Sequence, residues 1–141
     1  MRIMAIDYGD AHTGIAVSDP TGFLAGFTTV IDAYRPDIVA ERIALLAREH
    51  GAERLVLGHP INMDGTRGPR SEKAQSMKSL LEEATGLPVV LWDERRTTID
   101  AHQILFNSGK NAKKRKKVVD AVAASLILEG YLTYLKTHPE G

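Results

Sequence analysis

The sequence predicts a single α/β domain in which helices pack against a mixed β-sheet. Two features lead to this class. The first is a set of three short apolar segments, 2–9, 15–18 and 23–30, joined by short polar turns. Such links form an antiparallel meander, because a parallel crossover needs about a dozen residues or more. The second feature is the alternation of strand and helix patterns that follows, which indicates parallel pairing. We therefore expect one domain, 1–141.

The later elements are predicted from apolar spacing and from residues that start or stop helices. Pro36 suits a first helical turn, and Gly51 and Gly86 suit helix ends. In chain order, we expect a helix from Pro36 to about His50, a strand at 54–58, a helix at 71–85, a strand at 88–92, a helix from Thr97 or Thr98 to about Gly109, a basic loop at 110–117 and a last helix at 118–135.

Composition narrows the functional classes. With 43% hydrophobic and 26% charged residues, the chain has the composition of a soluble globular protein. No segment approaches the roughly 20 apolar residues of a membrane helix, and a strand pattern begins where a signal peptide would stand. The absence of cysteine excludes disulfides and thiolate chemistry. We expect a cytoplasmic protein without a membrane partner.

Acidic residues follow two of the predicted strands. Asp7 ends the first strand, and Asp93 and Glu94 end the fifth. Ligands of open α/β sheets gather at the carboxyl ends of parallel strands, so these acids are expected at one edge. Because side chains alternate along a strand, only one of the pair Asp93–Glu94 points toward Asp7, and the sequence does not choose between them.

The last helix supplies a further acid. Asp120 interrupts a helix that is apolar nearly all round and rich in alanine, which allows a close approach to the sheet. An ordinary alternative is an acid stabilised by the helix dipole. Three converging carboxylates would repel one another unless cations join them, and oxygen ligands select Mg²⁺ or Mn²⁺. A pair of such ions is typical of phosphodiester hydrolysis.

A basic segment lies directly before Asp120. Six of the eight residues from Lys110 to Lys117 are Lys or Arg, and the chain as a whole has zero net charge. A solvated loop is one interpretation, and a contact with a nucleic-acid backbone is the other. The candidate phosphate-binding residues are Arg95, Lys110, Lys113, Lys114, Arg115, Lys116 and Lys117. The histidines His12, His59 and His102 lack zinc-ligand spacing and are expected in loops or on the surface.

Four motifs together resemble a known family over essentially the whole chain. They are Asp7-Tyr8-Gly9 with Gly14 and Ser18-Asp19; Gly58-His59-Pro60-Ile61-Asn62-Met63-Asp64-Gly65-Thr66; Asp93-Glu94-Arg95 with Thr97-Thr98; and Asp120-Ala121-Val122-Ala123-Ala124. In this order they resemble the YqgF/RuvX family of bacterial pre-16S ribosomal RNA nucleases, also described as Holliday junction resolvases. His59 departs from the family pattern, which usually has leucine there.

The resemblance implies a ribonuclease H-like fold with five strands in the order 3-2-1-4-5 and helices on both faces. It also implies a divalent-metal nuclease site on Asp7, the pair Asp93–Glu94 and Asp120, and within the pair we favour Glu94. We expect a Mg²⁺- or Mn²⁺-dependent nuclease that processes precursor 16S rRNA. The alternatives are a homodimeric resolvase of branched DNA and a nucleic-acid-binding assembly factor that no longer cuts.

Overall fold

The computed structural model describes residues 1–19, 25–59, 68–93 and 112–138, and for residues 25 and 112–120 it describes the backbone alone. Its elements are β1 (Ile3–Asp7), β2 (His12–Ser18), β3 (Ala25–Asp32), α1 (Pro36–His50), β4 (Arg54–His59), α2 (Pro69–Thr85), β5 (Val89–Asp93) and α4 (Ala112–Thr137). The helix expected at 97–109 lies outside the described residues.

The five strands form one mixed sheet in the order β3-β2-β1-β4-β5. The pairs β1–β2 and β2–β3 are antiparallel, whereas β1–β4 and β4–β5 are parallel. The predicted meander, the parallel second half and the strand order are therefore confirmed. β1 lies at the centre of the sheet, where its carboxyl end is flanked by strands on both sides.

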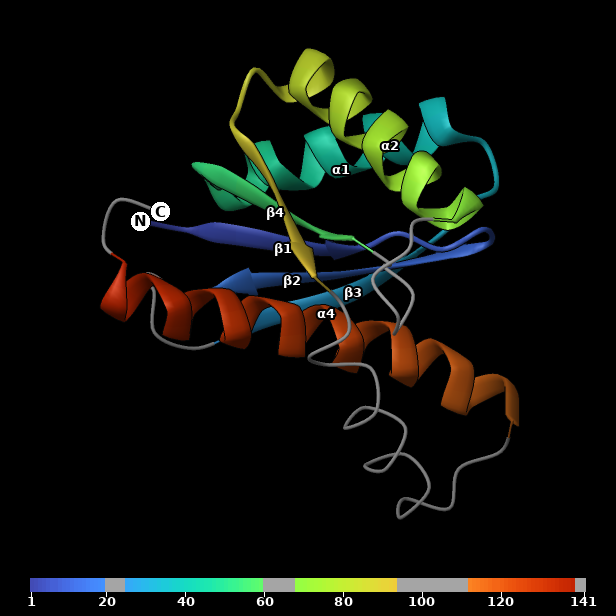
Figure 1. The fold of residues 1–141 in the computed structure, drawn as a ribbon. Helices are drawn as coiled ribbons and strands as arrows, with labels where there is room; N and C mark the ends of the chain where they lie inside the picture. The colour runs from blue at the N-terminus through green and yellow to red at the C-terminus, as the bar shows by residue number, and fades with distance from the viewer. Residues whose placement is uncertain (20–24, 60–67, 94–111, 139–141) are drawn as a thin grey trace.

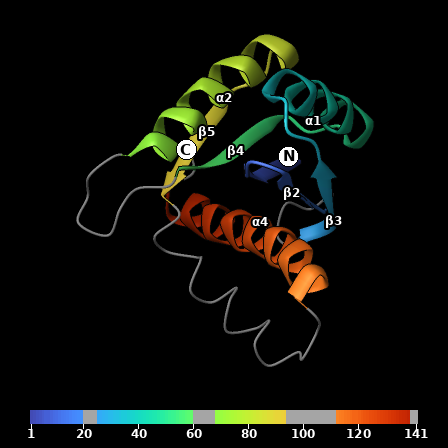
Figure 2. The same ribbon diagram turned by 90° about the vertical axis from the view of Figure 1, so that its right-hand side faces the viewer.

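Helices cover both faces of this sheet. α1 and α2 lie side by side on one face, and α4 crosses the other (Figures 1 and 2). The alternation of β1 separates the two layers, because Met4 and Ile6 pack under α1 and α2 whereas Ile3 and Ala5 pack under α4. Each fully buried Ile or Leu side chain contributes about 1.5–3 kcal/mol. The sheet is thus covered on both sides, as parallel strands require.

The ends of α1 and α2 follow the residues that predicted them. Pro36 and Pro69 open the two helices. Gly51 and Gly86 end them with φ values of 66° and 68°, in the left-handed region that glycine adopts without steric cost. No described helix combines the length and the apolar character that crossing a membrane requires.

The start of the last helix differs from the prediction. α4 begins at Ala112, so the residues from Lys113 to Lys117 are helical, and the loop predicted up to Lys117 is wrong. Lys, Arg and Ala all have good helix propensity, and neither Gly nor Pro interrupts this stretch. At 1.5 Å per residue the helix is about 39 Å long. Its N-terminal end extends beyond the sheet (Figure 1).

Candidate active site

The central acid of the candidate site is Asp7, the last residue of β1. Its Cα is paired with that of Gly14 in the antiparallel ladder. Asp7 has the same strand parity as Ile3 and Ala5, whose side chains pack against α4. The Asp7 side chain is half-buried. An acid therefore stands at the carboxyl end of the central strand, on the face of the sheet that α4 covers.

Small residues form part of the contact between α4 and this face of the sheet. Ala124 is fully buried and belongs to the same packed cluster as Ala5 and Ala16. Further along the helix, a Cβ added to Gly130 would lie 3.2 Å from the ring of Trp92. Residue 120 lies one helical turn before Ala124. The backbone of α4 thus carries the second predicted acid toward the edge that holds Asp7.

The third predicted acid comes from the end of β5. Leu91 packs against the layer of α1 and α2, and Trp92 packs edge-on against Tyr131 of α4, with ring centroids 5.9 Å apart. Asp93 follows Trp92 within the strand, so alternation puts it on the face of Leu91, opposite to Asp7. Glu94 lies outside the described residues. Of the two neighbouring acids, Asp93 is separated from Asp7 by the thickness of the sheet.

No three acidic or histidine residues converge as a metal-binding group among the residues that the structure describes. Three further candidates, Glu94, Arg95 and Lys110, are outside those residues. Asp120 and the basic residues from Lys113 to Lys117 have a described backbone within α4. Hence the structure brings together Asp7 and the helix that carries Asp120.

His59 is a feature that sequence reasoning missed. It ends β4, is only 6% exposed, and its Nε2 lies 2.6 Å from Oγ of Ser71, which is fully buried in α2. The expectation of a loop or surface histidine is therefore wrong for His59. A signal was present, because Leu55, Leu57 and His59 share the parity of the strand face that meets α2.

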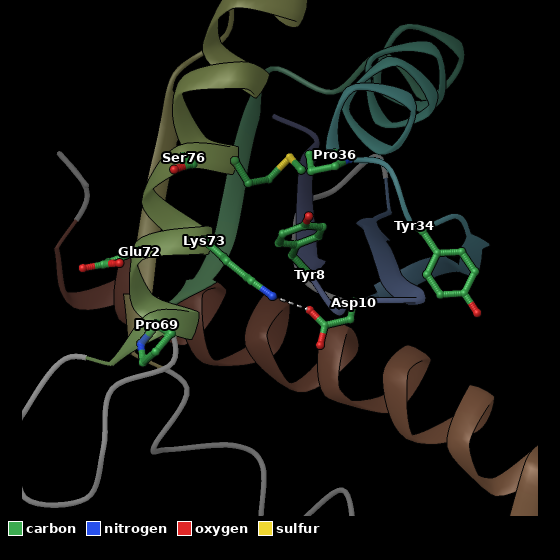
Figure 3. A pocket seen from close by; sticks show the side chains of 9 residues that line it. Tyr8, Asp10, Tyr34, Pro36, Pro69, Glu72, Lys73 and Ser76 are labelled. Carbon is green, nitrogen blue, oxygen red and sulfur yellow. Dashed lines mark hydrogen bonds and ion pairs between the residues drawn. The ribbon is translucent and has the colours of Figure 1, made fainter.

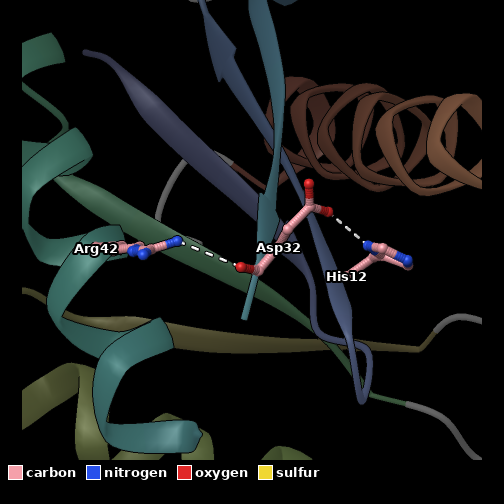
Figure 4. Close-up of polar contacts among 3 residues, drawn as sticks. All are labelled: His12, Asp32 and Arg42. Carbon is pink, nitrogen blue, oxygen red and sulfur yellow. Dashed lines mark hydrogen bonds and ion pairs between the residues drawn. The ribbon is translucent and has the colours of Figure 1, made fainter. Parts of the chain in front are cut away.

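A polar pair at the same edge of the sheet connects the start of β2 to the end of β3. His12 opens β2 and Asp32 closes β3, and His12 Nδ1 lies 2.5 Å from Asp32 Oδ1. The guanidinium of Arg42 in α1 donates to the Asp32 carbonyl at 3.4 Å (Figure 4). These contacts hold the outer strands beside the candidate site. The side chain of His12 therefore has a structural role in pairing β2 with β3.

A groove of about 570 Å³ opens on the side of α1 and α2. It is lined by Tyr8, Asp10 and Tyr34 together with Lys73 and other residues of α2, and the Lys73 ammonium lies 3.0 Å from the Asp10 carboxylate (Figure 3). Burial raises the pKa of the Tyr8 phenol; Lys73 acts in the opposite direction, and Asp10 adds to the increase. Because Tyr8 follows Asp7 in the chain, this groove lies across the sheet from the acid.

The arrangement defines the class of protein. A solved structure titled "T. thermophilus RuvC in complex with Holliday junction substrate" is similar to this chain, with a TM-score of 0.63 at 16% identity and 97% of each chain covered. At that identity the likeness shows the fold. The sheet order 3-2-1-4-5, with helices on both faces, is the ribonuclease H-like fold.

Sequence comparison then defines the family. The model of the RuvX family, described as "Holliday junction resolvase", matches residues 1–134, and the chain belongs to this family. A relative from Halothermothrix orenii is 43% identical over 134 residues, covering 95% of this chain and 96% of the relative. A relative from Listeria monocytogenes is 45% identical over 134 residues, covering 94% and 97%. Both carry the name "Putative pre-16S rRNA nuclease".

Proposed function

We propose that this protein is a divalent-metal-dependent nuclease that hydrolyses phosphodiester bonds of structured RNA, with precursor 16S rRNA as its substrate. The observation that carries the proposal is the position of Asp7 at the carboxyl end of the central strand, on the face that α4 covers. The names of the sequence relatives support the choice of substrate.

The residues that would hold the metal are Asp7, Glu94 and Asp120. All three offer carboxylate oxygens, the donors that Mg²⁺ and Mn²⁺ prefer, so the donor chemistry fits. Asp93 is left out of this set because it stands on the face of Leu91. Held by these residues, a pair of ions would supply activation of the attacking water and stabilisation of charge on the leaving oxygen.

Binding of the nucleic-acid backbone would fall to the basic residues of the chain. α4 carries five consecutive basic residues, 113–117, on a helical backbone just before Asp120. A helix holds its cations at fixed spacings, so this stretch would hold backbone phosphates next to the scissile bond. Arg95 and Lys110 would add further phosphate contacts. Binding is then governed by the phosphate backbone rather than by base identity.

The test is cleavage of labelled precursor 16S rRNA in the presence of Mn²⁺. We expect the wild type to cut and Asp7→Asn to abolish cutting. The loss should exceed the 10–100-fold that removal of an outer partner of a metal ligand typically costs. Asp10→Asn is the matched control, since Asp10 lies three residues further on and bonds Lys73 in the groove of the other face. Undiminished cutting by Asp7→Asn would refute the assignment.

A second candidate is resolution of branched DNA, favoured by the description of the family model that matches residues 1–134. Resolution requires paired cuts and therefore a homodimer. A synthetic four-way junction distinguishes the two functions: symmetric paired nicks by a species of twice the chain mass support resolution. A third possibility, an assembly factor that binds without cutting, predicts that Asp7→Asn still sustains growth in cells that depend on this protein.

A further inference from the structure

We propose that Asp93, His59 and Ser71 form a chain of side-chain contacts behind the sheet edge, and that this chain positions the acid that follows Asp93. Asp93 is then a positioning residue rather than a metal ligand. The inference rests on the proposed function, because it concerns the placement of Glu94 in the metal site.

The first link of the chain is the bond between His59 and Ser71. His59 Nε2 lies 2.6 Å from Ser71 Oγ, and the two side chains are 6% and 0% exposed. Ser71 is the third residue of α2. The residue at the N-cap position of this helix is Gly68, which has no side chain to cap it. The start of α2 is therefore attached to the end of β4 through a buried polar contact.

The second link follows from the register of the sheet. His59 and Asp93 are Cα partners in the parallel ladder of β4 and β5. His59 faces α2, as its bond to Ser71 shows, and Asp93 shares a face with Leu91, which packs in the same layer. Neighbouring strands of a sheet lie about 4.7–4.9 Å apart, so paired residues on one face are adjacent. The carboxylate of Asp93 is thus the immediate neighbour of the imidazole.

The chemistry of the three groups is complementary. A neutral imidazole donates from one ring nitrogen and accepts at the other. Donation from Nδ1 to the Asp93 carboxylate leaves Nε2 to accept the proton of the Ser71 hydroxyl. A buried imidazole is costly unless both nitrogens are paired, so this assignment also explains how His59 is accommodated in the core.

The consequence for the site concerns the edge strand β5. Among the strands that the structure describes, β5 is the last of the sheet and has β4 as its neighbour. Its last residue, Asp93, is attached through His59 to α2, and the next residue along the chain is Glu94. Loss of a group that hydrogen-bonds a metal ligand typically costs 10–100-fold in metal affinity. Asp93 would act on the next residue through the backbone, so we expect an effect near the lower end of that range.

The experiment measures Mn²⁺ binding by electron paramagnetic resonance on the full chain, without nucleic acid. We expect His59→Leu and Asp93→Ala each to weaken Mn²⁺ binding about tenfold or more. His59→Gln can donate and accept at the same time, so it should stay within about threefold of the wild type. In the wild type, the His59 ring N–H should give a nitrogen-15 resonance protected from exchange, which Asp93→Ala should remove.

The control for a merely structural role is Met77→Ala. Met77 is 1% exposed and lies in α2, outside the proposed chain of contacts. This variant should lower stability and leave Mn²⁺ affinity unchanged. Equal weakening by Met77→Ala and His59→Leu, or unchanged binding in His59→Leu and Asp93→Ala, would overturn the proposal. Mn²⁺ binding that responds as expected, in a protein that cuts no RNA, would instead overturn the proposed function alone.

Discussion

The two faces of the sheet are packed in different ways. Under α1 and α2 the sheet presents larger aliphatic side chains such as Met4, Ile6 and Leu57. Under α4 it presents the small residues Ala5 and Ala16 together with the larger Ile3 and Val56. Interiors are close-packed, so the backbones of helix and sheet can lie nearer together where Ala5 and Ala16 share a cluster with Ala124 of α4.

The polar groups divide in the same way. On the side of α1 and α2, Lys73 is paired with Asp10 at 3.0 Å, and His59 is bonded to Ser71. These contacts connect neighbouring elements of the fold. On the side of α4, Asp7 ends the central strand, and the face on which it stands is the one that packs against α4. The difference indicates that the layer of α1 and α2 supports the edge, whereas the α4 layer assembles the proposed site.

The largest expected effect comes from overpacking each layer in turn. Ala124→Leu on α4 and Ala40→Leu on α1 both enlarge a fully or almost fully buried alanine, at 0% and 3% exposure. Each should lower the free energy of unfolding by about 1–3 kcal/mol, measured by urea denaturation. Only Ala124→Leu displaces the helix that carries Asp120, so it alone should also reduce RNA cleavage, by about tenfold or more.

The control is built into that pair of variants. Cleavage is compared at a temperature where circular dichroism shows both variants fully folded. Similar cleavage by Ala124→Leu and Ala40→Leu would mean that the two faces of the sheet do not differ in function, and the comparison between them would fail.

A smaller effect, on the salt dependence of RNA binding, is expected from removing cations at the basic start of α4. Lys113→Ala combined with Lys117→Ala removes two cations from the end of the helix near the site. Each lost phosphate contact lowers the slope of log affinity against log salt by about 0.7–0.9. We therefore expect a slope reduced by about 1.4–1.8 for RNA binding, measured by fluorescence anisotropy with Asp7→Asn as background to prevent cutting.

The matched control removes two cations elsewhere. Lys78→Ala in α2 combined with Lys136→Ala in the last turn of α4 produces the same change in net charge. This double variant should keep the wild-type salt slope. Equal slopes for the two double variants would show that net charge, and not the basic helix, controls binding.

The sequence predicted the order of elements because its local signals agreed with the packing. α1 begins at Pro36 and ends before Gly51, as expected. The short turns after Asp7 and Ser18 are compatible only with an antiparallel meander, which the structure has. The start of α4 was mispredicted because a run of lysines is compatible with either a solvated loop or a helix. A local pattern of charge does not decide between them.

The site was only partly predictable for a different reason. Alternation predicted that only one of Asp93 and Glu94 points toward Asp7, but the choice depends on the layer against which Leu91 packs, and tertiary packing decides that. His59 was misread because histidine is usually polar surface, while its partner Ser71 is twelve residues further along the chain. Neither His59 nor Ser71 reveals, from its position in the sequence alone, that the two side chains are hydrogen-bonded.

The smallest expected effect is a pH dependence that belongs to the face of α1 and α2. Burial raises the pKa of Tyr8 in the folded protein above its ordinary value of 10.0. The folded state therefore holds the phenolic proton more tightly than the unfolded state. This contribution to stability is fully present below pH 10 and is lost as the pH rises through the folded pKa. Tyr8→Phe removes the titrating group, so its free energy of unfolding should fall less steeply than that of the wild type above pH 10, in urea denaturation at a series of pH values. Tyr34→Phe serves as the control, because Tyr34 is 79% exposed and lies in the same groove. If the free energy of unfolding of Tyr8→Phe fell with pH as steeply as that of the wild type, burial in the groove would not raise the pKa of the phenol. The contrast between the face that supports the edge and the face that carries the proposed site would then depend on His59 and Lys73 alone.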